Sequence, residues 1–372
     1  MFRFKTLWKN KVFIVFLVVI VALAPQAAAR PAQMLSKTLV TTLGINRIAG
    51  EYEISGEVII NKADQPQSAE RKNVVMSATA PTIGEAINKI SASTGREVSF
   101  AHCTLLIIAS SLDGESVLPL LTYFLQKTEI SNSVVLVYTT GDPKAVIAAS
   151  IANGNAQGGL LQQIAKYNQD NVFGRPTSLE SFFKDTLRPG QATVIGAVSF
   201  VGESLTNKME GAVFMGGKYV FTLDEARVTA MNFLSRKKTK LRYITELDDG
   251  VNAVVAVRDK KPKVKVMFVG ETPHIAISVK ASVRVEELSH QLDINNSLPV
   301  IDIEMALVQK LTADLTSALA SLAAHKTDIL NVYDMLNRSN RRALRTFMNG
   351  KDPADVVAAA TYEIKVDANV YS

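Results

Sequence analysis

Cysteine is almost absent from this chain of 372 residues, in which Cys103 is the only one. One thiol cannot form an intramolecular disulfide, so no such bond supports the fold. Cys103 stands at the start of an apolar run, and we expect it to be a small core residue. The residues directly after the apolar N-terminal segment, 25–31, include no cysteine, which predicts that no lipid is attached there.

Histidine is also scarce, and its four occurrences are far apart in the sequence: His102, His274, His290 and His325. The sequence lacks the motifs H-E-x-x-H, C-x-x-C, G-x-S-x-G and G-x-x-x-x-G-K-[ST]. We expect His102, beside an apolar strand, to be a structural group rather than a ligand. Three acidic residues stand on a long predicted helix: Asp302, Glu304 and Asp314. We expect them to complement the positive charge of the helix N-terminus rather than to form a catalytic pair. The residues therefore predict no catalytic activity, no cofactor and no metal site.

A general excess of basic charge is missing as well. The chain has 41 basic and 35 acidic residues, but four of the cations (Arg3, Lys5, Lys9 and Lys11) precede one apolar run. Without residues 1–29 the balance is 37 basic against 35 acidic residues, a net charge close to +2. Such a chain has no broad basic field, and we predict that it does not bind nucleic acid.

Residues 1–29 have the pattern of an export signal. A basic flank precedes an apolar core, Val12 to Ala24, and the small residues 27–29 follow. Cleavage after Ala29 fits the small-x-small rule. The alternative is an uncleaved anchor, because only Pro25 and Gln26 interrupt the apolar stretch, although its core is short for a membrane span. Either form places the rest of the chain outside the cytoplasm.

The remainder predicts an α+β fold of three mixed domains with mainly antiparallel sheets, over residues 30–145, 146–262 and 263–372. A hydrophobic content of 47% favours packed cores over disorder. In the first domain, Ser99 to Ser110 is predicted to be one nearly continuous central strand. In the middle domain, Gly216-Gly217 predicts a hairpin turn and Asp224 a helix cap. A turn is expected at 260–262, between two alternating strands.

The C-terminal domain has the clearest pattern. Apolar residues alternate with polar ones from Ile275 to Val285 and again from Tyr362 to Val370, as in half-buried strands. Between these strands one apolar stripe recurs every three or four residues: Ile303, Leu307, Leu311, Leu315, Leu319 and Leu322. This spacing predicts a long amphipathic helix packed on a sheet.

Two basic clusters are candidate contact surfaces. The first contains Arg236, Lys237, Lys238, Lys240 and Arg242, and the second contains Arg338, Arg341, Arg342 and Arg345. Each basic residue near an anionic lipid surface contributes about 1 kcal/mol of attraction. A solvated strand or helix face accounts for the same patterns, and acidic residues such as Glu246 adjoin the first cluster.

Four segments together resemble the Ger(x)C family, the C subunits of spore nutrient germinant receptors. They are LVTTLGI (39–45), SFAHCTLLII (99–108), EGAVFMGGKYVFTLDEARVTAMNF (210–233) and IDIEMALVQKLTADLTSALASLAAHKTDIL (301–330). The third resembles a G-x-A-V-F hairpin followed by a helix opening with D/E-E-x-R. In the fourth, Lys326, Asp328 and Ile329 match a K-x-D-I/L step.

The resemblance implies a non-enzymatic protein on the outer face of the inner spore membrane, beside A-type and B-type integral-membrane subunits. The chain departs from the family by lacking the lipid-bearing cysteine, and Phe347 to Ala360 replaces a tryptophan-bearing region. The alternative function is an exported binding or assembly component of another envelope complex. An exported hydrolase ranks third, because the scattered histidines offer it no support.

Overall fold

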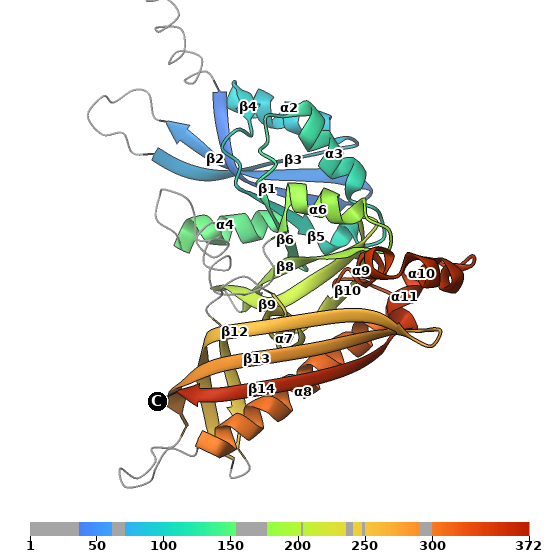
Figure 1. Ribbon diagram of the computed structural model, residues 1–372. Helices are drawn as coiled ribbons and strands as arrows, with labels where there is room; N and C mark the ends of the chain where they lie inside the picture. Colours follow the sequence, from blue (N-terminus) through green and yellow to red (C-terminus); the bar gives the residue numbers. More distant parts are fainter. Residues whose placement is uncertain are drawn as a thin grey trace, which may run out of the picture.

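The strands of the protein form two sheets (Figure 1). The computed structural model describes residues 37–61, 71–153, 177–201, 204–235, 241–247, 250–289 and 300–371. Within these residues the larger sheet has ten strands and the smaller sheet has four. A mixed α/β fold with a long C-terminal helix is therefore confirmed.

The larger sheet has the order β10-β9-β8-β6-β5-β1-β2-β3, with β4 beside β1 and β7 beside β6. Its strands are β1 (Lys37–Ile48), β2 (Glu51–Asn61), β3 (Arg71–Ala80), β4 (Glu97–Ser99), β5 (Leu105–Ala109), β6 (Val135–Thr139), β7 (Thr177–Ser178), β8 (Ala192–Val201), β9 (Ser204–Met215) and β10 (Lys218–Leu223). The central neighbours β1, β5, β6 and β8 run parallel to one another, so this sheet is mixed rather than mainly antiparallel. Every residue of β5 is buried, as expected for a parallel strand covered on both faces.

The predicted continuous strand from Ser99 to Ser110 is wrong. β1 pairs with β4 up to Leu39–Ser99 and with β5 from Thr42–Leu105. Residues 100–104 therefore lie between β4 and β5, whereas β1 spans the same distance with only residues 40 and 41. Residues 100–104 form a turn, in which the Cys103 amide donates to the Phe100 carbonyl at 2.9 Å. Hydrophobicity continues through this turn because Phe100 and Cys103 are both buried.

Helices cover both faces of the larger sheet (Figure 1). They are α2 (Ile83–Thr94), α3 (Leu118–Lys127), α4 (Pro143–Asn153) and α6 (Leu179–Thr186). Local caps close both ends of α2: the Thr82 side chain accepts from the Glu85 amide, and Gly95 ends the helix with φ 64°. α2, α3 and α6 contribute to one core and α4 to another.

The smaller sheet has the order β11-β12-β13-β14. Its strands are β11 (Leu241–Glu246), β12 (Asn252–Val269), β13 (Thr272–Leu288) and β14 (Thr361–Tyr371), and α8 (Val300–Ala324) lies along one face (Figure 1). The six apolar residues of the predicted helix stripe are all buried, which confirms the predicted packing. β14 runs parallel to β13, because α8 and the short helices after it return the chain across the sheet.

The turn expected at 260–262 is wrong, because β12 continues through Pro262, which is paired with Val279. β11 pairs with β12 only as far as Val257, so the rest of β12 is a sheet edge. An edge tolerates a proline, and lysines at 261, 263 and 265 protect it from pairing with other chains.

The expected boundary at residue 145 falls within the larger sheet, because β6 pairs with β8. The strands thus divide between two sheets, and the division into three domains stays a prediction. α7 (Glu225–Phe233) lies between the sheets, and its buried residues share a core with the smaller sheet and α8. Among the described residues no helix is both long and apolar enough to cross a membrane.

Candidate functional site

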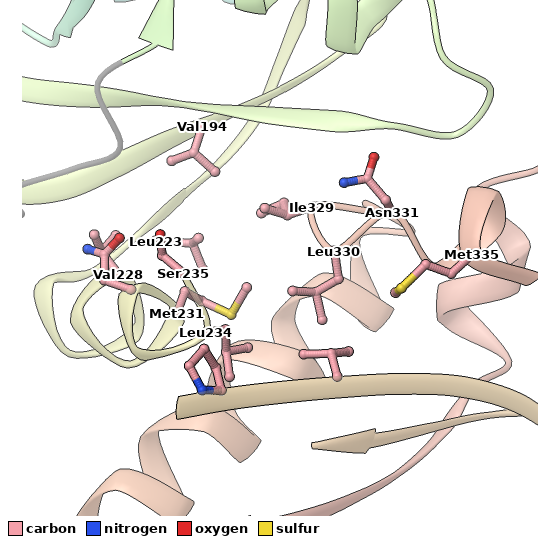
Figure 2. Close-up of a pocket in the computed structure, with 13 residues that line it drawn as sticks. Val194, Leu223, Val228, Met231, Leu234, Ser235, Ile329, Leu330, Asn331 and Met335 are labelled. Atoms are coloured by element: carbon pink, nitrogen blue, oxygen red, sulfur yellow. The ribbon is translucent and has the colours of Figure 1, made fainter. Parts of the chain in front are cut away.

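A cavity of about 210 Å³ lies where the two sheets meet (Figure 2). It is bounded by β8, the end of β10, α7, the edge of β12, the segment after α8 and α9 (Val332–Ser339). The residues that line it are Val194, Leu223, Val228, Met231, Asn232, Leu234, Ser235, Pro262, Val264, Ile329, Leu330, Asn331 and Met335. Figure 2 shows Met231 and Leu234 facing Leu330 and Met335 across the opening, with Val194 on a third side.

One wall of the cavity is α7, whose start and whose contact with α8 are fixed by hydrogen bonds of its first residues. The Asp224 side chain accepts from the Arg227 amide at 2.9 Å and caps the helix. The Arg227 guanidinium then reaches Ser317 on α8, with Nε to Oγ at 3.0 Å. The D-E-x-R pattern of the sequence thus fixes the start of α7 and its contact with α8. Val228, which follows Arg227 directly, and Met231, one turn after Arg227, line the cavity.

Gly211 on β9 supports the same wall. A Cβ at this position would lie 2.4 Å from Cγ1 of Val194 and 3.1 Å from Cγ2 of Val228, and both valines line the cavity. Such contacts are too close for any side chain without movement of the neighbours. Gly211, directly before Ala212, Val213 and Phe214, therefore lets β9 approach β8 and α7.

The opposite wall is the segment between α8 and α9. Lys326 and Asn331 both have positive φ, 52° and 61°, so the chain turns sharply at each end of this segment. The buried Asp328 carboxylate accepts from the amides of Val332 at 2.9 Å and Tyr333 at 3.0 Å, which fixes the start of α9. Burial raises the pKa of Asp328, while these amide hydrogen bonds oppose the rise. Ile329 and Leu330 are thereby held against the cavity.

The polar lining is small. Asn232 is 5% exposed, and its Nδ2 has no hydrogen-bond acceptor among the described residues. The Oδ1 atom of Asn331 accepts from the Arg188 guanidinium at 3.2 Å. Beside the cavity the Lys260 ammonium donates to the main-chain oxygen of Asn232, and burial lowers the pKa of Lys260 to about 8. The site therefore offers a mainly apolar surface, and the unpartnered Asn232 amide nitrogen is itself closed off from solvent.

The first basic cluster is only partly described. Arg236, Lys237, Lys238 and Lys240 lie outside the described residues. Arg242, on β11, is exposed, and its Nε donates to the Glu286 carboxylate at 2.7 Å. Its charge is thus partly balanced within the smaller sheet.

The second basic cluster lies on α9 and α10 (Arg341–Met348), at one side of the molecule (Figure 1). Arg338 pairs with Asp334 at 2.7 Å. Arg341, Arg342 and Arg345 are exposed, and none has a carboxylate within ion-pair distance among the described residues. The structure does not bring this cluster to the cavity lining.

The three described histidines stay apart, and His290 lies outside the described residues. His102 is exposed in the turn before β5, His274 contacts Thr361 on β14, and His325 stacks on Phe221 with ring centres 4.0 Å apart. Within the described ranges no group of three histidine, cysteine or acidic side chains is placed to hold a metal.

Cys103 is buried, and burial raises the pKa of its thiol to about 12, which makes it a poor nucleophile. Two acidic residues of α8 contact the sheet: Glu304 accepts from the Val370 amide of β14 at 2.8 Å, and Asp314 contacts Tyr243 of β11 as well as Lys310. Asp302 is exposed in the first turn of the helix. Glu304 therefore joins the helix to the final strand, a contact that the sequence did not indicate.

Sequence reasoning did not find the cavity. Six of its thirteen lining residues come from the motif segments 210–233 and 301–330. The apolar residues of those segments looked like ordinary core residues. The residue that could have indicated an unusual site is Asn232. Its polar amide lies on the buried side of a helix, among Val228, Met231 and Phe233.

Comparisons with known proteins agree with this architecture. Residues 34–200 match the family model described as "Spore germination protein N-terminal domain", and residues 209–372 match "Spore germination B3/ GerAC like, C-terminal". The fold is similar to that in "Crystal Structure of the GerBC protein", with a TM-score of 0.59 and 15% identity, over 89% of this chain and 97% of that one. Among curated proteins there is no match.

Proposed function

The chain belongs to the GerAC-like family of spore germination proteins, and on this premise we propose that it is the C subunit of a nutrient germinant receptor. It acts in germination signalling through contact with A-type and B-type integral-membrane subunits and catalyses no reaction. The observation that carries the proposal is that family models match both halves of the chain, residues 34–200 and 209–372.

The structural roles of the motif residues support a role in contact rather than chemistry. Asp224 and Arg227 attach α7 to α8, and Asp328 fixes the chain between α8 and α9. Each of these charged groups is engaged in fixing a helix or the segment beside it. A protein that passes a signal by contact needs such a fixed relation between its parts.

The proposed location is the outer face of the inner spore membrane. Support comes from the basic flank and apolar core of residues 1–29, which have the pattern of an export signal. Cys103 is buried in the fold and cannot serve as a lipid attachment point. In this proposal the retained apolar segment or the partner subunits hold the chain at the membrane.

The first basic cluster is proposed as a membrane or partner contact. Replacing Arg236, Lys237 and Lys238 by glutamate should lower the amount of the chain recovered with the spore membrane and slow germination. Lys261, Lys263 and Lys265, which are exposed on the edge of β12, provide a matched set for reversal as a control. Unchanged recovery and unchanged germination in the 236–238 variant would remove the proposed role of the cluster.

Fractionation of producing cells and their spores tests the assignment, with sequencing of the N-terminus of the recovered protein. The proposal expects the chain in the inner spore membrane fraction. An intact Met1 would identify the apolar segment as the anchor, and a start at Arg30 would identify partners as the means of attachment. A freely secreted protein that is absent from spores would overturn the receptor assignment and favour a binding component of another envelope complex.

A further inference from the structure

We propose that β14 pairs edge to edge with β14 of a second copy of the chain, so that the two smaller sheets join into one. The paired strands run antiparallel, and Val366 lies on the symmetry axis between them. This inference goes beyond the proposed function, because it concerns the association of the chain with itself. Three observations support it: the open edge of β14, its charge pattern, and its partly exposed apolar residues.

β14 is an open edge of the smaller sheet (Figure 1). Its only partner strand among the described residues is β13, and the two pair without a register shift. The Val370 amide points away from β13, because it donates to the Glu304 carboxylate at 2.8 Å. Since backbone direction alternates along a strand, the amides of Ile364, Val366 and Ala368 also point outward. Such a row of backbone groups without a neighbouring strand is a template for another strand.

The other open edge of the same sheet is protected, whereas β14 is not. β12 extends beyond the end of β11 and carries the three alternating lysines described above. Two such edges would place lysine near lysine, which disfavours pairing. The exposed face of β14 instead alternates in charge, with Glu363, Lys365 and Asp367 in succession.

The charges of β14 fit a second copy in one register. With Val366 opposite itself, the whole strand is paired, and Lys365 faces Asp367 of the other copy on each side of the axis. Opposite charges at directly opposed positions stabilise an antiparallel pair. Moving the axis to Lys365 would place lysine against lysine and Glu363 against Asp367. Lys365 is available for this contact: Asp367 binds Lys280 at 3.3 Å, but no carboxylate among the described residues lies within ion-pair distance of Lys365.

Pairing would also cover apolar surface. The side chains of Ile364 and Val366 pack against the core of the smaller sheet but remain partly exposed. A strand inside a sheet has a neighbour on each side, and β14 has one. A second β14 would place Val366 beside Val366 and Ile364 beside Ala368, which removes apolar area from water.

The test is charge reversal followed by complementation. Lys365→Asp leaves acidic residues at both positions, and Asp367→Lys leaves lysines at both. Each variant alone should dimerise at least about tenfold more weakly than the native chain, because like charges then face each other. An equimolar mixture of the two variants should dimerise again, because each lysine of one then faces an acidic residue of the other.

Sedimentation velocity of the purified full chain in detergent, over a wide range of concentration, measures the association. The native dimer should form on concentration, because an edge-to-edge contact is small and small contacts give reversible association. Association through the apolar segment of residues 1–29 would not respond to the charges at 365 and 367.

Two further variants separate the edges of the sheet. Val366→Pro removes the outward donor at the centre of the proposed ladder, and a proline is tolerated at an edge strand, so this variant should fold and stay monomeric. Lys263→Asp makes the same charge reversal on the exposed face of β12 and is the matched control. It should dimerise as the native chain does.

Several outcomes would overturn the proposal. They are a native chain that stays monomeric at every concentration, variants at 365, 366 or 367 that associate as tightly as the native chain, a mixture that associates no better than its components, and loss of the dimer in Lys263→Asp. None of these results would change the receptor assignment, which depends on membrane recovery and partners.

Discussion

The main-chain amide of Ala192 donates a hydrogen bond to the main-chain oxygen of Asp328 at 2.9 Å. This bond joins the first residue of β8 in the larger sheet to the segment that follows α8 on the smaller sheet. Gln191 and Asp328 also form an isolated parallel bridge. Ala192 and Val194 belong to the same core as β13 and α8. The two sheets are therefore connected through backbone and core together, and we expect them to move as one unit.

Asp328 should be the most sensitive polar residue of this connection. Its carboxylate accepts from two amides while it is 1% exposed. Asp328→Ala leaves these amides without an acceptor, and we expect a loss of about 2–4 kcal/mol in the free energy of unfolding. Asp334→Ala, which breaks the exposed pair with Arg338, is the control and should cost under about 1 kcal/mol. Urea unfolding measures both, and equal losses would contradict the assigned role.

Gly190, just before β8, lies against the 353–354 segment that precedes α11 (Asp355–Ala358). It has φ 69°, and a Cβ there would lie 2.9–3.0 Å from backbone atoms of Pro353 and Ala354. Gly190→Ala should therefore add a steric cost to the strain of the positive φ. Gly50→Ala has the same strain, with φ 88°, but nothing within 4 Å of the new Cβ.

Thermal unfolding compares these two glycine variants. We expect Gly190→Ala to be destabilised by about 1–3 kcal/mol more than Gly50→Ala, which is the usual cost of forced overpacking. Similar melting temperatures would show that the contact between Gly190 and the 353–354 segment contributes nothing to stability.

Because Lys260 is partly buried, we expect the free energy of unfolding to rise with pH. Burial lowers its folded-state pKa from 10.5 to about 8. Between these values the unfolded chain holds a proton that the folded chain has released, so the free energy of unfolding increases as pH rises. Lys260→Met removes this contribution, and Lys261→Met, an exposed neighbour, retains it. Unfolding measured from pH 8 to pH 10.5 should give a shallower rise for Lys260→Met only, and parallel curves for all three proteins would refute the assignment.

The thiol of Cys103 should be protected in the folded chain. It is 3% exposed, and its pKa is raised to about 12. Alkylation by iodoacetamide near pH 8, the ordinary range of a thiol, should therefore be slow in buffer and fast in urea. A Cys103→Ala chain with His102→Cys places a thiol on the neighbouring exposed residue and should react rapidly in both conditions. Rapid labelling of native Cys103 would show that the turn before β5 opens readily.

The sequence predicted elements where local chemistry determines the structure. The alternation in β13, the apolar stripe of α8 and the Asp224 cap each depend on neighbouring residues, and all are confirmed. The turn predicted at 260–262 depends on Pro262, because a proline normally interrupts a sheet. Only the three-dimensional position of β12 beyond the end of β11 shows that this proline lies on an edge, where it is tolerated.

The cavity could not be predicted for a similar reason. Val194, Met231 and Leu330 come from segments that are far apart in sequence, and each has the character of a core residue. A void depends on how three packed elements fail to fill the space between them, and no single segment encodes that relation. The likeness of segments 210–233 and 301–330 to family motifs marked the right regions without indicating what they enclose.

Affinity purification of the tagged chain from solubilised spore membranes tests the central claim most directly. If the chain is a non-enzymatic receptor subunit, two integral-membrane proteins should co-purify with it, and spores that lack the chain should lose the response to at least one nutrient. Recovery of the chain without membrane partners, from spores whose germination does not change when it is deleted, would contradict the account.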